Sequence, residues 1–83
     1  MNEQELVTAL AEELHRIAPD VDLAAIDRDG DLREQFDIDS MDFLNLITSL
    51  QKRYGIPIPQ SDYARLASFA GVLDYLTEKT HRA

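Results

Sequence analysis

Cysteine and tryptophan are absent from this chain of 83 residues, and glycine and proline occur three times each. The lack of cysteine excludes a disulfide bond and a thiolate metal site, as is usual for cytoplasmic proteins. No hydrophobic run approaches the roughly 20 residues that a membrane-spanning helix requires, and the acidic N-terminus does not resemble a signal peptide. We therefore expect a cytoplasmic protein without stable membrane insertion.

Positive charge is also scarce, since 8 lysines and arginines are set against 16 aspartates and glutamates, for a net charge of -8. This balance argues against nucleic acid as a partner and favours basic protein surfaces. Five of the eight net negative charges fall within residues 27–42, where seven acids accompany only Arg28 and Arg33. Such a field would attract a basic partner, although a solvated loop without a partner has the same composition. The seven acids are Asp27, Asp29, Asp31, Glu34, Asp37, Asp39 and Asp42.

The apolar residues of the chain are spaced as in helices. Stretches at about 3–18, 40–54 and 69–80 repeat hydrophobic side chains every three or four residues, and a shorter helix is expected at about 61–66. No alternating pattern predicts a strand. We predict a single all-α domain over residues 1–83, folded as a small four-helix bundle with three long helices and one short helix.

The ends of these helices are marked by residues with known preferences. Asn2, Ser61 and Ser68 can cap helices because their side chains accept hydrogen bonds from free backbone N–H groups. Pro19 stops the first helix, since it cannot continue the hydrogen-bond ladder. Gly55 follows a basic last turn and is a typical C-terminal stop.

Residues 19–39 form a long, acidic loop with too many apolar side chains for a free linker. We expect this loop to lie on the core and to include a short helical turn near 32–36. Its apolar residues are Val21, Leu23, Ile26, Leu32 and Phe36. The predicted buried face of the helix at 40–54 comprises Met41, Leu44, Ile47, Leu50 and Tyr54, widened by Phe43 and Leu46.

The alternating aspartates that begin at Asp27 suggest the start of a calcium-binding loop. With Asp27 as the first ligand, the sixth position should be glycine but is Leu32, and the twelfth should be glutamate but is Ile38. The frame that puts Gly30 sixth places Ala25 at the first position, where it cannot bind the ion. We expect no dedicated metal site.

Ser40 lies between Asp39 and Asp42 at the start of the second long helix, where a serine commonly serves as a cap. As a nucleophile it would need a general base within hydrogen-bond reach, but His15 and His81 are both distant in the sequence. The two aspartates would project from an exposed helix start, and a shallow bundle offers no cleft around them. We therefore predict that the protein is not an enzyme.

The surroundings of Ser40 resemble the core of the acyl carrier proteins. In that family an Asp-Ser-Leu triplet opens the second helix, which ends at an aromatic-glycine pair followed by an elbow similar to Ile-x-Ile-Pro. Residues 39–59 read DSMDFLNLITSLQKRYGIPIP, with Asp39–Met41 as the triplet, Tyr54–Gly55 as the helix end and Ile56–Pro59 as the elbow. The first and last helices are similar too, so the resemblance covers nearly the whole chain.

The resemblance implies that Ser40 accepts 4′-phosphopantetheine from coenzyme A through a separate, magnesium-dependent phosphopantetheinyl transferase. The thiol of this arm would carry acyl groups as thioesters between partner enzymes of a fatty acid, polyketide or related pathway, and the expected state is a monomer. The alternative is an acidic helical module that is never modified and binds a protein partner or divalent cations.

The resemblance also implies partner contacts near the serine. Free N–H groups and the helix dipole favour a phosphate at a helix start, but the neighbouring aspartates oppose it, so a covalent bond is needed. We expect these aspartates to contact the modifying enzyme and other enzymes with basic docking surfaces. Phe43 serves either as a partner contact or as extra core packing. The predicted recognition residues are Asp37, Asp39, Met41, Asp42 and Phe43.

Departures from the family favour a specialised, free-standing carrier. Phe36 and Asp37 stand where the family often has Leu-Gly, and Met41 replaces the leucine after the serine. Fatty-acid-synthesis carriers usually place several glutamates further along this helix. This chain has Asn45, Thr48, Gln51, Lys52 and Arg53 there.

An acyl chain could be sequestered inside the bundle. The residues expected to line such a cavity are Phe36, Leu44 and Ile47, with Ile26, Leu32 and Met41 beside them. A filled core without a cavity is the alternative.

Overall fold

The computed structural model describes residues 2–20 and 22–80, which form an all-α fold. The elements in order are α1 (Glu3–Ile17), the 3₁₀ helix η1 (Leu23–Ala25), α2 (Leu32–Phe36), α3 (Ser40–Tyr54), the 3₁₀ helix η2 (Gln60–Leu66) and α4 (Phe69–Thr80). The described residues contain no strand, only an isolated bridge between Asp31 and Ser68. The predicted small helical bundle is therefore confirmed.

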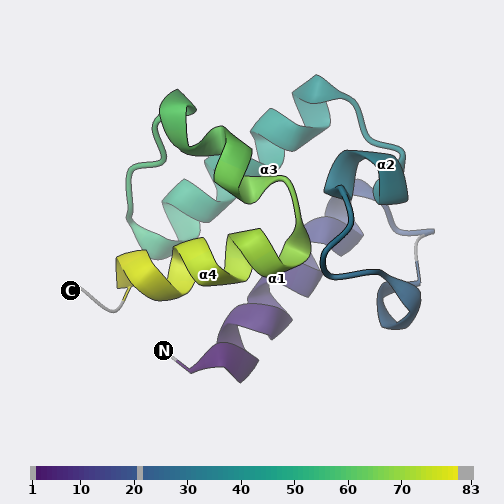
Figure 1. Ribbon diagram of the computed structural model, residues 1–83, viewed down its shortest axis with the longest axis horizontal. Coiled ribbons are helices and arrows are strands. Elements are labelled where there is room, and N and C mark those ends of the chain that lie inside the picture. Colours follow the sequence, from purple (N-terminus) through teal and green to yellow (C-terminus); the bar gives the residue numbers. More distant parts are fainter. Residues whose placement is uncertain (1, 21, 81–83) are drawn as a thin grey trace.

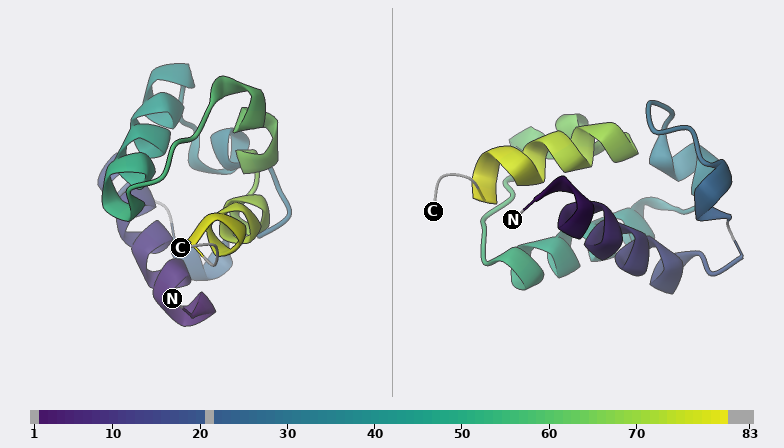
Figure 2. Two further views of the ribbon diagram at one scale, coloured as in Figure 1. Left: turned by 90° about the vertical axis from the view of Figure 1, so that its left-hand side faces the viewer. Right: turned by 90° about the horizontal axis from the view of Figure 1, so that it is seen from below.

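The long helices pack around one core, with α1 against both α3 and α4, and η2 against α4. In Figure 1, α4 lies in front of α1, and α3 runs back in the opposite direction to α1. Figures 1 and 2 show α2 at one end of the bundle, beside the start of α3 and away from the last turn of α4. The short helix α2 thus lies next to the start of α3.

The core consists mainly of leucines, which α1, α2, α3, η2 and α4 all contribute. Full burial of one such side chain stabilises the fold by about 1.5–3 kcal/mol. The buried residues of the core are Leu6, Leu10 and Leu14 of α1, Leu32 and Phe36 of α2, Ile38, Leu46, Ile47 and Leu50 of α3 and its lead-in, Ile58, Leu66 of η2, and Phe69, Val72, Leu73, Tyr75 and Leu76 of α4.

Most predicted helix ends are confirmed. Oδ1 of Asn2 accepts a hydrogen bond from the N–H of Glu5 at 2.8 Å, and Oγ of Ser68 accepts one from the N–H of Gly71 at 3.0 Å. Gly55 ends α3 with φ at 62°, a left-handed conformation that favours glycine.

The prediction that Ser61 caps the short helix is wrong. That helix, η2, begins one residue earlier, at Gln60, and has no side-chain cap. The preceding Pro59 fixes the backbone there, and its carbonyl accepts a hydrogen bond from the N–H of Asp62 at 2.9 Å. Ser61 consequently lies within the first turn rather than before it.

The segment between α1 and α3 lies on the core, as predicted. Leu32 and Phe36 are buried, and Ile26 packs against the core with its side chain half-buried. Val21 and the side chain of Leu23 lie outside the described residues. The expected helical turn near residues 32–36 is α2.

The prediction for the buried face of α3 is partly wrong, because Met41 is 66% exposed and Leu44 is 42% exposed. The prediction is confirmed for Leu46, Ile47 and Leu50, which are the buried residues of α3. Each residue of a helix advances by about 100°, so Met41 lies about 120° around the axis from Ile47. The inward face is the stripe through Leu46 and Leu50, and Met41 points to solvent.

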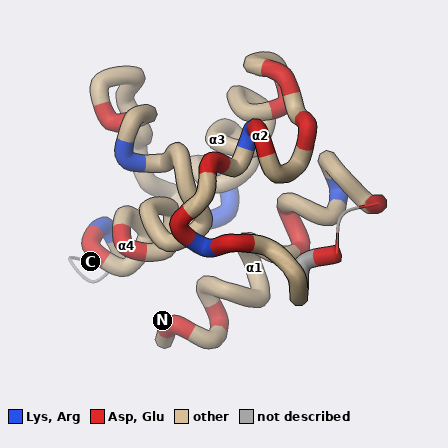
Figure 3. Tube along the Cα trace, turned by 45° about the vertical axis from the view of Figure 1, so that its right-hand side comes forward, with Lys and Arg blue, Asp and Glu red and all other residues tan. Residues whose placement is uncertain are grey.

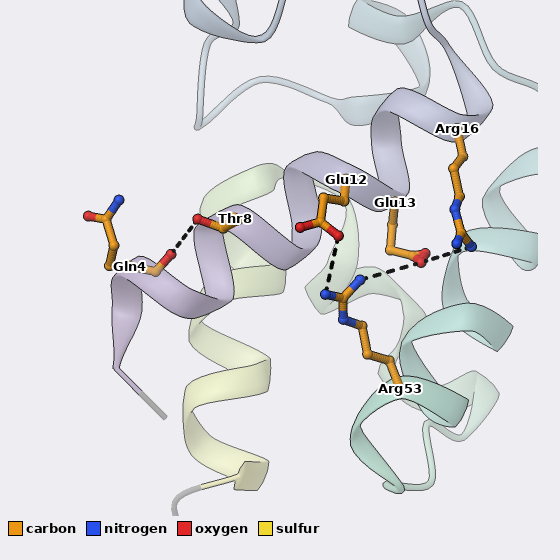
Figure 4. Close-up of polar contacts among 6 residues, drawn as sticks. All are labelled: Gln4, Thr8, Glu12, Glu13, Arg16 and Arg53. Atoms are coloured by element: carbon orange, nitrogen blue, oxygen red, sulfur yellow. Dashed lines mark hydrogen bonds and ion pairs between the residues drawn. The ribbon is translucent and has the colours of Figure 1, made fainter.

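A buried carboxylate joins α1 to the last turn of α3. Glu13 is only 5% exposed, and its Oε1 lies 3.4 Å from Nη1 of Arg16 and 3.8 Å from Nη1 of Arg53. Nη2 of Arg53 also lies 3.3 Å from Oε2 of Glu12 (Figure 4). Arg53 is therefore engaged within the fold. Its loss would be costly, because the buried Glu13 would lose one of its two cationic partners.

The attachment of η2 to α4 relies on a close approach and a buried tyrosine. Gly71 permits the approach, because a Cβ at this position would overlap the carbonyl oxygen of Arg65. The hydroxyl of the fully buried Tyr75 donates a hydrogen bond to Oδ2 of Asp62 at 2.7 Å. Burial, and secondly this hydrogen bond, raise the pKa of Tyr75 to about 12.

Candidate functional site

Ser40 is the first residue of α3, but its hydroxyl does not cap the helix. The N-cap is Asp39, whose Oδ1 accepts a hydrogen bond from the backbone N–H of Asp42 at 2.9 Å. The interpretation of Ser40 as a structural cap is therefore wrong. Its exposed side chain lies at the N-terminus of a 15-residue helix with no capping role.

The side chain of Ser40 contacts an arginine from a different element. Nη2 of Arg33, on α2, donates a hydrogen bond to Oγ of Ser40 at 2.9 Å. A guanidinium stays protonated and cannot take the hydroxyl proton. This contact therefore does not activate Ser40 for nucleophilic catalysis.

A groove of about 390 Å³ opens beside Ser40, between α2, the start of α3 and η2. The rings of Phe43 and Tyr63, which both line it, meet edge to face, with centroids 6.3 Å apart and planes at 83°. Side chains that line the groove include those of Arg33, Ser40, Phe43, Leu44, Tyr63 and Ala64. Ser40 is thus at the edge of a partly apolar surface hollow.

One end of this groove is held together by the backbone. The N–H of Leu32 donates a hydrogen bond to the carbonyl of Ala67 at 2.8 Å, next to the bridge between Asp31 and Ser68. Asp31 and Ala67 both line the groove. The walls from α2 and from the end of η2 therefore keep a fixed separation at this point.

The predicted recognition residues lie within three positions of Ser40 in the sequence and differ in exposure. Asp37, Asp39 and Met41 are exposed, whereas Asp42 and Phe43 are half-buried. Phe43 both lines the groove and packs against the core, so both of its expected roles have a structural basis.

Asp37 occupies an unusual backbone conformation at the end of α2. Its φ of 51° lies in the left-handed region, and its N–H donates to the carbonyl of Arg33. Aspartate tolerates this conformation better than most side chains, although glycine adopts it at least cost. The glycine that acyl carrier proteins often have at the position of Asp37 would therefore have a direct physical reason.

The three residues predicted to line an acyl cavity do not line one hollow in the structure. Leu44 lines the groove beside Ser40, whereas Ile47 is buried in the core. Phe36 is also buried, and it contributes to the lining of a second hollow of about 330 Å³, together with Pro19 and Asp42. The groove thus has only Leu44 in common with the predicted set.

Acidic positions gather around α2 and the loop before it (Figure 3). Despite this density, no group of three or more potential metal-binding side chains occurs in the part of the chain that the structure describes. His15 is exposed on α1, and His81 lies outside the described residues. No helix within residues 2–20 and 22–80 is long and apolar enough to cross a membrane.

Two features of the site were not predicted from the sequence. Arg33 precedes Ser40 by seven residues, and no spacing rule indicates that their side chains meet. Tyr63 and Ala64 belong to η2, whose position across from α3 depends on the tertiary fold. The one local sequence signal for this side of the groove is an aromatic residue, Tyr63, four positions after the elbow at residues 56–59.

The residues around Ser40 fit a phosphate-linked arm. The side chain of Ser40 is exposed, the guanidinium of Arg33 lies within hydrogen-bond distance of its Oγ, and both residues line the groove. An arginine and the free N–H groups of a helix start both favour a phosphate.

Comparison with known proteins agrees with this geometry. Residues 4–76 match a family model described as the phosphopantetheine attachment site. The polyketide-8 synthase acyl carrier protein 2 of Streptomyces avermitilis is 32% identical over 60 residues, which cover 72% of this chain and 69% of that protein. The acyl carrier protein of Campylobacter hominis is 33% identical over 60 residues, covering 72% and 71%. That of Rickettsia typhi is 29% identical over 77 residues, covering 93% and 84%. The chain therefore belongs to the acyl carrier protein family, whose members carry acyl groups on 4′-phosphopantetheine and are not themselves enzymes.

Proposed function

We propose that this chain bears 4′-phosphopantetheine on Ser40 and passes thioester-bound acyl intermediates between enzymes of a polyketide, fatty acid or related pathway, as a cytoplasmic monomer. The observation that carries the assignment is the state of Ser40. Its side chain is exposed and lies at the edge of a groove, and it does not cap the helix because Asp39 does. When bound, the group supplies a thiol at the end of a flexible arm. Ser40 anchors the arm, and the apolar side chains of the groove offer a surface on which it can lie.

The partner surface is proposed to lie around the start of α3. Asp37 and Asp39 are exposed there, next to the exposed apolar side chains of Met41 and Leu44. Such a combination suits a partner whose basic groups surround an apolar contact. At the other end of α3 the charge of Arg53 is paired with two glutamates of α1.

We further propose a specialised carrier rather than the general carrier of fatty acid synthesis. Beyond Asp42, the exposed positions of α3 include Asn45, Thr48 and Lys52, none of which is acidic. Along α3, a basic enzyme surface would therefore find acidic side chains only in the first turn, with further ones in the neighbouring α2. This distribution supports a set of partner enzymes selected for that one end of the helix.

Intact-mass measurement tests the attachment site. After incubation with coenzyme A, magnesium and a phosphopantetheinyl transferase, the mass of the chain should rise by one phosphopantetheine group. Ser40→Ala should abolish the rise, whereas Ser61→Ala, which changes an exposed serine of η2, should leave it unchanged. An unmodified wild-type chain under conditions that modify another carrier would overturn the proposal. Modification of Ser40→Ala would assign the arm to a different residue.

A further inference from the structure

Arg33 differs from the other described arginines in how its charge is satisfied. Arg16, Arg53 and Arg65 all form ion pairs, and the guanidinium of Arg28 lies 5.4 Å from the centre of the Phe69 ring. Arg33 lies within the most acidic segment of the chain, yet it forms no ion pair with any described residue. Its one described side-chain partner is the neutral hydroxyl of Ser40.

The position of Arg33 is set by a well-anchored element. Oδ1 of Asp31 caps α2 by accepting hydrogen bonds from the N–H groups of Arg33 at 2.8 Å and Glu34 at 3.1 Å. Leu32 and Phe36 hold the same helix in the core. The guanidinium therefore extends toward Ser40 from a fixed base, and only one of its five N–H donors is accounted for by that contact.

Modification of Ser40 would change what Arg33 faces. The hydroxyl oxygen would become part of a phosphodiester, whose two free oxygens share one negative charge. A guanidinium matches such a pair of oxygens better than it matches a hydroxyl, because it can donate two parallel hydrogen bonds. Asp39 and Asp42 lie close by in the sequence and would repel the phosphate without this compensation.

We infer that Arg33 binds the phosphodiester of the arm and holds its first part over the groove that Arg33 and Ser40 both line. This inference rests on the proposed attachment at Ser40. Arg33 acts as a positioning residue: it fixes the direction in which the arm leaves α3. Since Arg33 pairs with the phosphate and not with the aspartates, the aspartates remain available to basic partner enzymes.

Phosphorus NMR of the loaded protein tests this pairing. Wild type, Arg33→Gln and Arg28→Gln would be loaded to completion, as shown by intact mass. Arg28→Gln is the matched control, because it removes the same charge from the same acidic segment without touching Ser40. We expect the ³¹P resonance of Arg33→Gln to be displaced and narrower than that of wild type, since its phosphate would move more freely. The resonance of Arg28→Gln should coincide with that of wild type.

Melting temperatures give a second measurement. The change on loading should be more unfavourable in Arg33→Gln than in wild type or Arg28→Gln, by roughly 1–5 °C, because the phosphate then lacks its cation. Arg33→Lys keeps the charge but cannot donate two parallel hydrogen bonds, so it should give intermediate values in both experiments.

Each outcome bears on a different statement. If all three proteins gain the mass but share one ³¹P resonance and one loading effect on melting, the pairing is wrong and the carrier function stands. If Arg33→Gln loads more slowly but reaches the wild-type resonance, Arg33 serves the transferase rather than the arm, and the inference is overturned. If wild type gains no mass, the proposed function fails and the inference fails with it.

Discussion

At the scale of single residues, two neighbours at the start of α3 have separate tasks. Asp39 satisfies the N–H of Asp42, whereas the hydroxyl of Ser40 bonds to no backbone group of its own helix in the described structure. A serine that capped the helix would have to give up that cap, worth about 0.5–2 kcal/mol, when a group was attached to it. An arm attached to Ser40 would leave the cap of α3 in place.

Asp39→Asn separates the two properties of the capping residue. Asparagine accepts the same capping hydrogen bond, so α3 should keep its helicity and stability. It lacks the charge that attracts a basic transferase, so the initial rate of modification at low ionic strength should fall several-fold, and the difference should shrink as salt is added. Mass spectrometry over a time course measures the rate. Asp29→Asn, in the exposed loop, is the control; equal slowing in both variants would show that only net charge matters.

Single residues also show which features could be predicted from the sequence and which could not. The start of α3 at Asp39 and Ser40 could be located from the sequence, because it belongs to a local pattern around a helix end. The contact between Arg33 and Ser40 could not, because it joins two helices across a turn. Its existence depends on how α2 is placed by Leu32 and Phe36 in the core.

At the scale of elements, α3 carries two overlapping apolar stripes. One has a residue every three positions, at Met41, Leu44, Ile47 and Leu50, and turns around the axis by about 60° per step, whereas the other, through Leu46, Ile47 and Leu50, stays on one face. Spacing by three residues alone could not decide where the apolar residues leave the buried face. The packing of α3 against α1 decides it and leaves Met41 and Leu44 exposed.

Truncation of one residue from each stripe checks this orientation. Leu46→Ala should lower the free energy of unfolding by about 2–5 kcal/mol, because Leu46 is only 1% exposed and its loss leaves a cavity. Leu44→Ala should change stability by less than about 1 kcal/mol, because that side chain is 42% exposed. Urea denaturation of the unmodified proteins measures both. Similar losses in the two variants would contradict the orientation of α3.

Helix boundaries were easier to predict than helix faces. Asn2, Pro19, Gly55 and Ser68 each act through their own backbone or side chain, so their effects do not depend on distant packing. The boundary of η2 was misplaced because Ser61 had to be weighed against the preceding Pro59, and the proline determines the start of this helix.

At the scale of the whole molecule, negative charge is concentrated around α2, where Figure 3 shows many acidic positions close together. Self-repulsion in this region opposes the compact state. The Debye length falls from about 30 Å to about 8 Å between low and physiological ionic strength. The melting temperature of the unmodified protein should therefore rise by a few degrees over this range, as followed by circular dichroism.

A charge-reduced variant provides the comparison. Asp29→Asn combined with Glu34→Gln removes two exposed charges from the region, so its melting temperature should begin higher and rise less with salt. A wild-type melting temperature that stays constant or falls as salt is added would mean that repulsion around α2 has no net effect on stability.

The backbone link between Leu32 and Ala67 also limits what this carrier can accommodate. Since α2 and the end of η2 cannot separate at that point without breaking main-chain hydrogen bonds, a bulkier cargo cannot gain room by spreading the helices there. Extra space would have to come from side chains that line the groove, such as the rings of Phe43 and Tyr63. The length and bulk of the acyl group that rests against the protein would then be governed by two aromatic side chains, and longer chains would extend into solvent or into the partner enzyme.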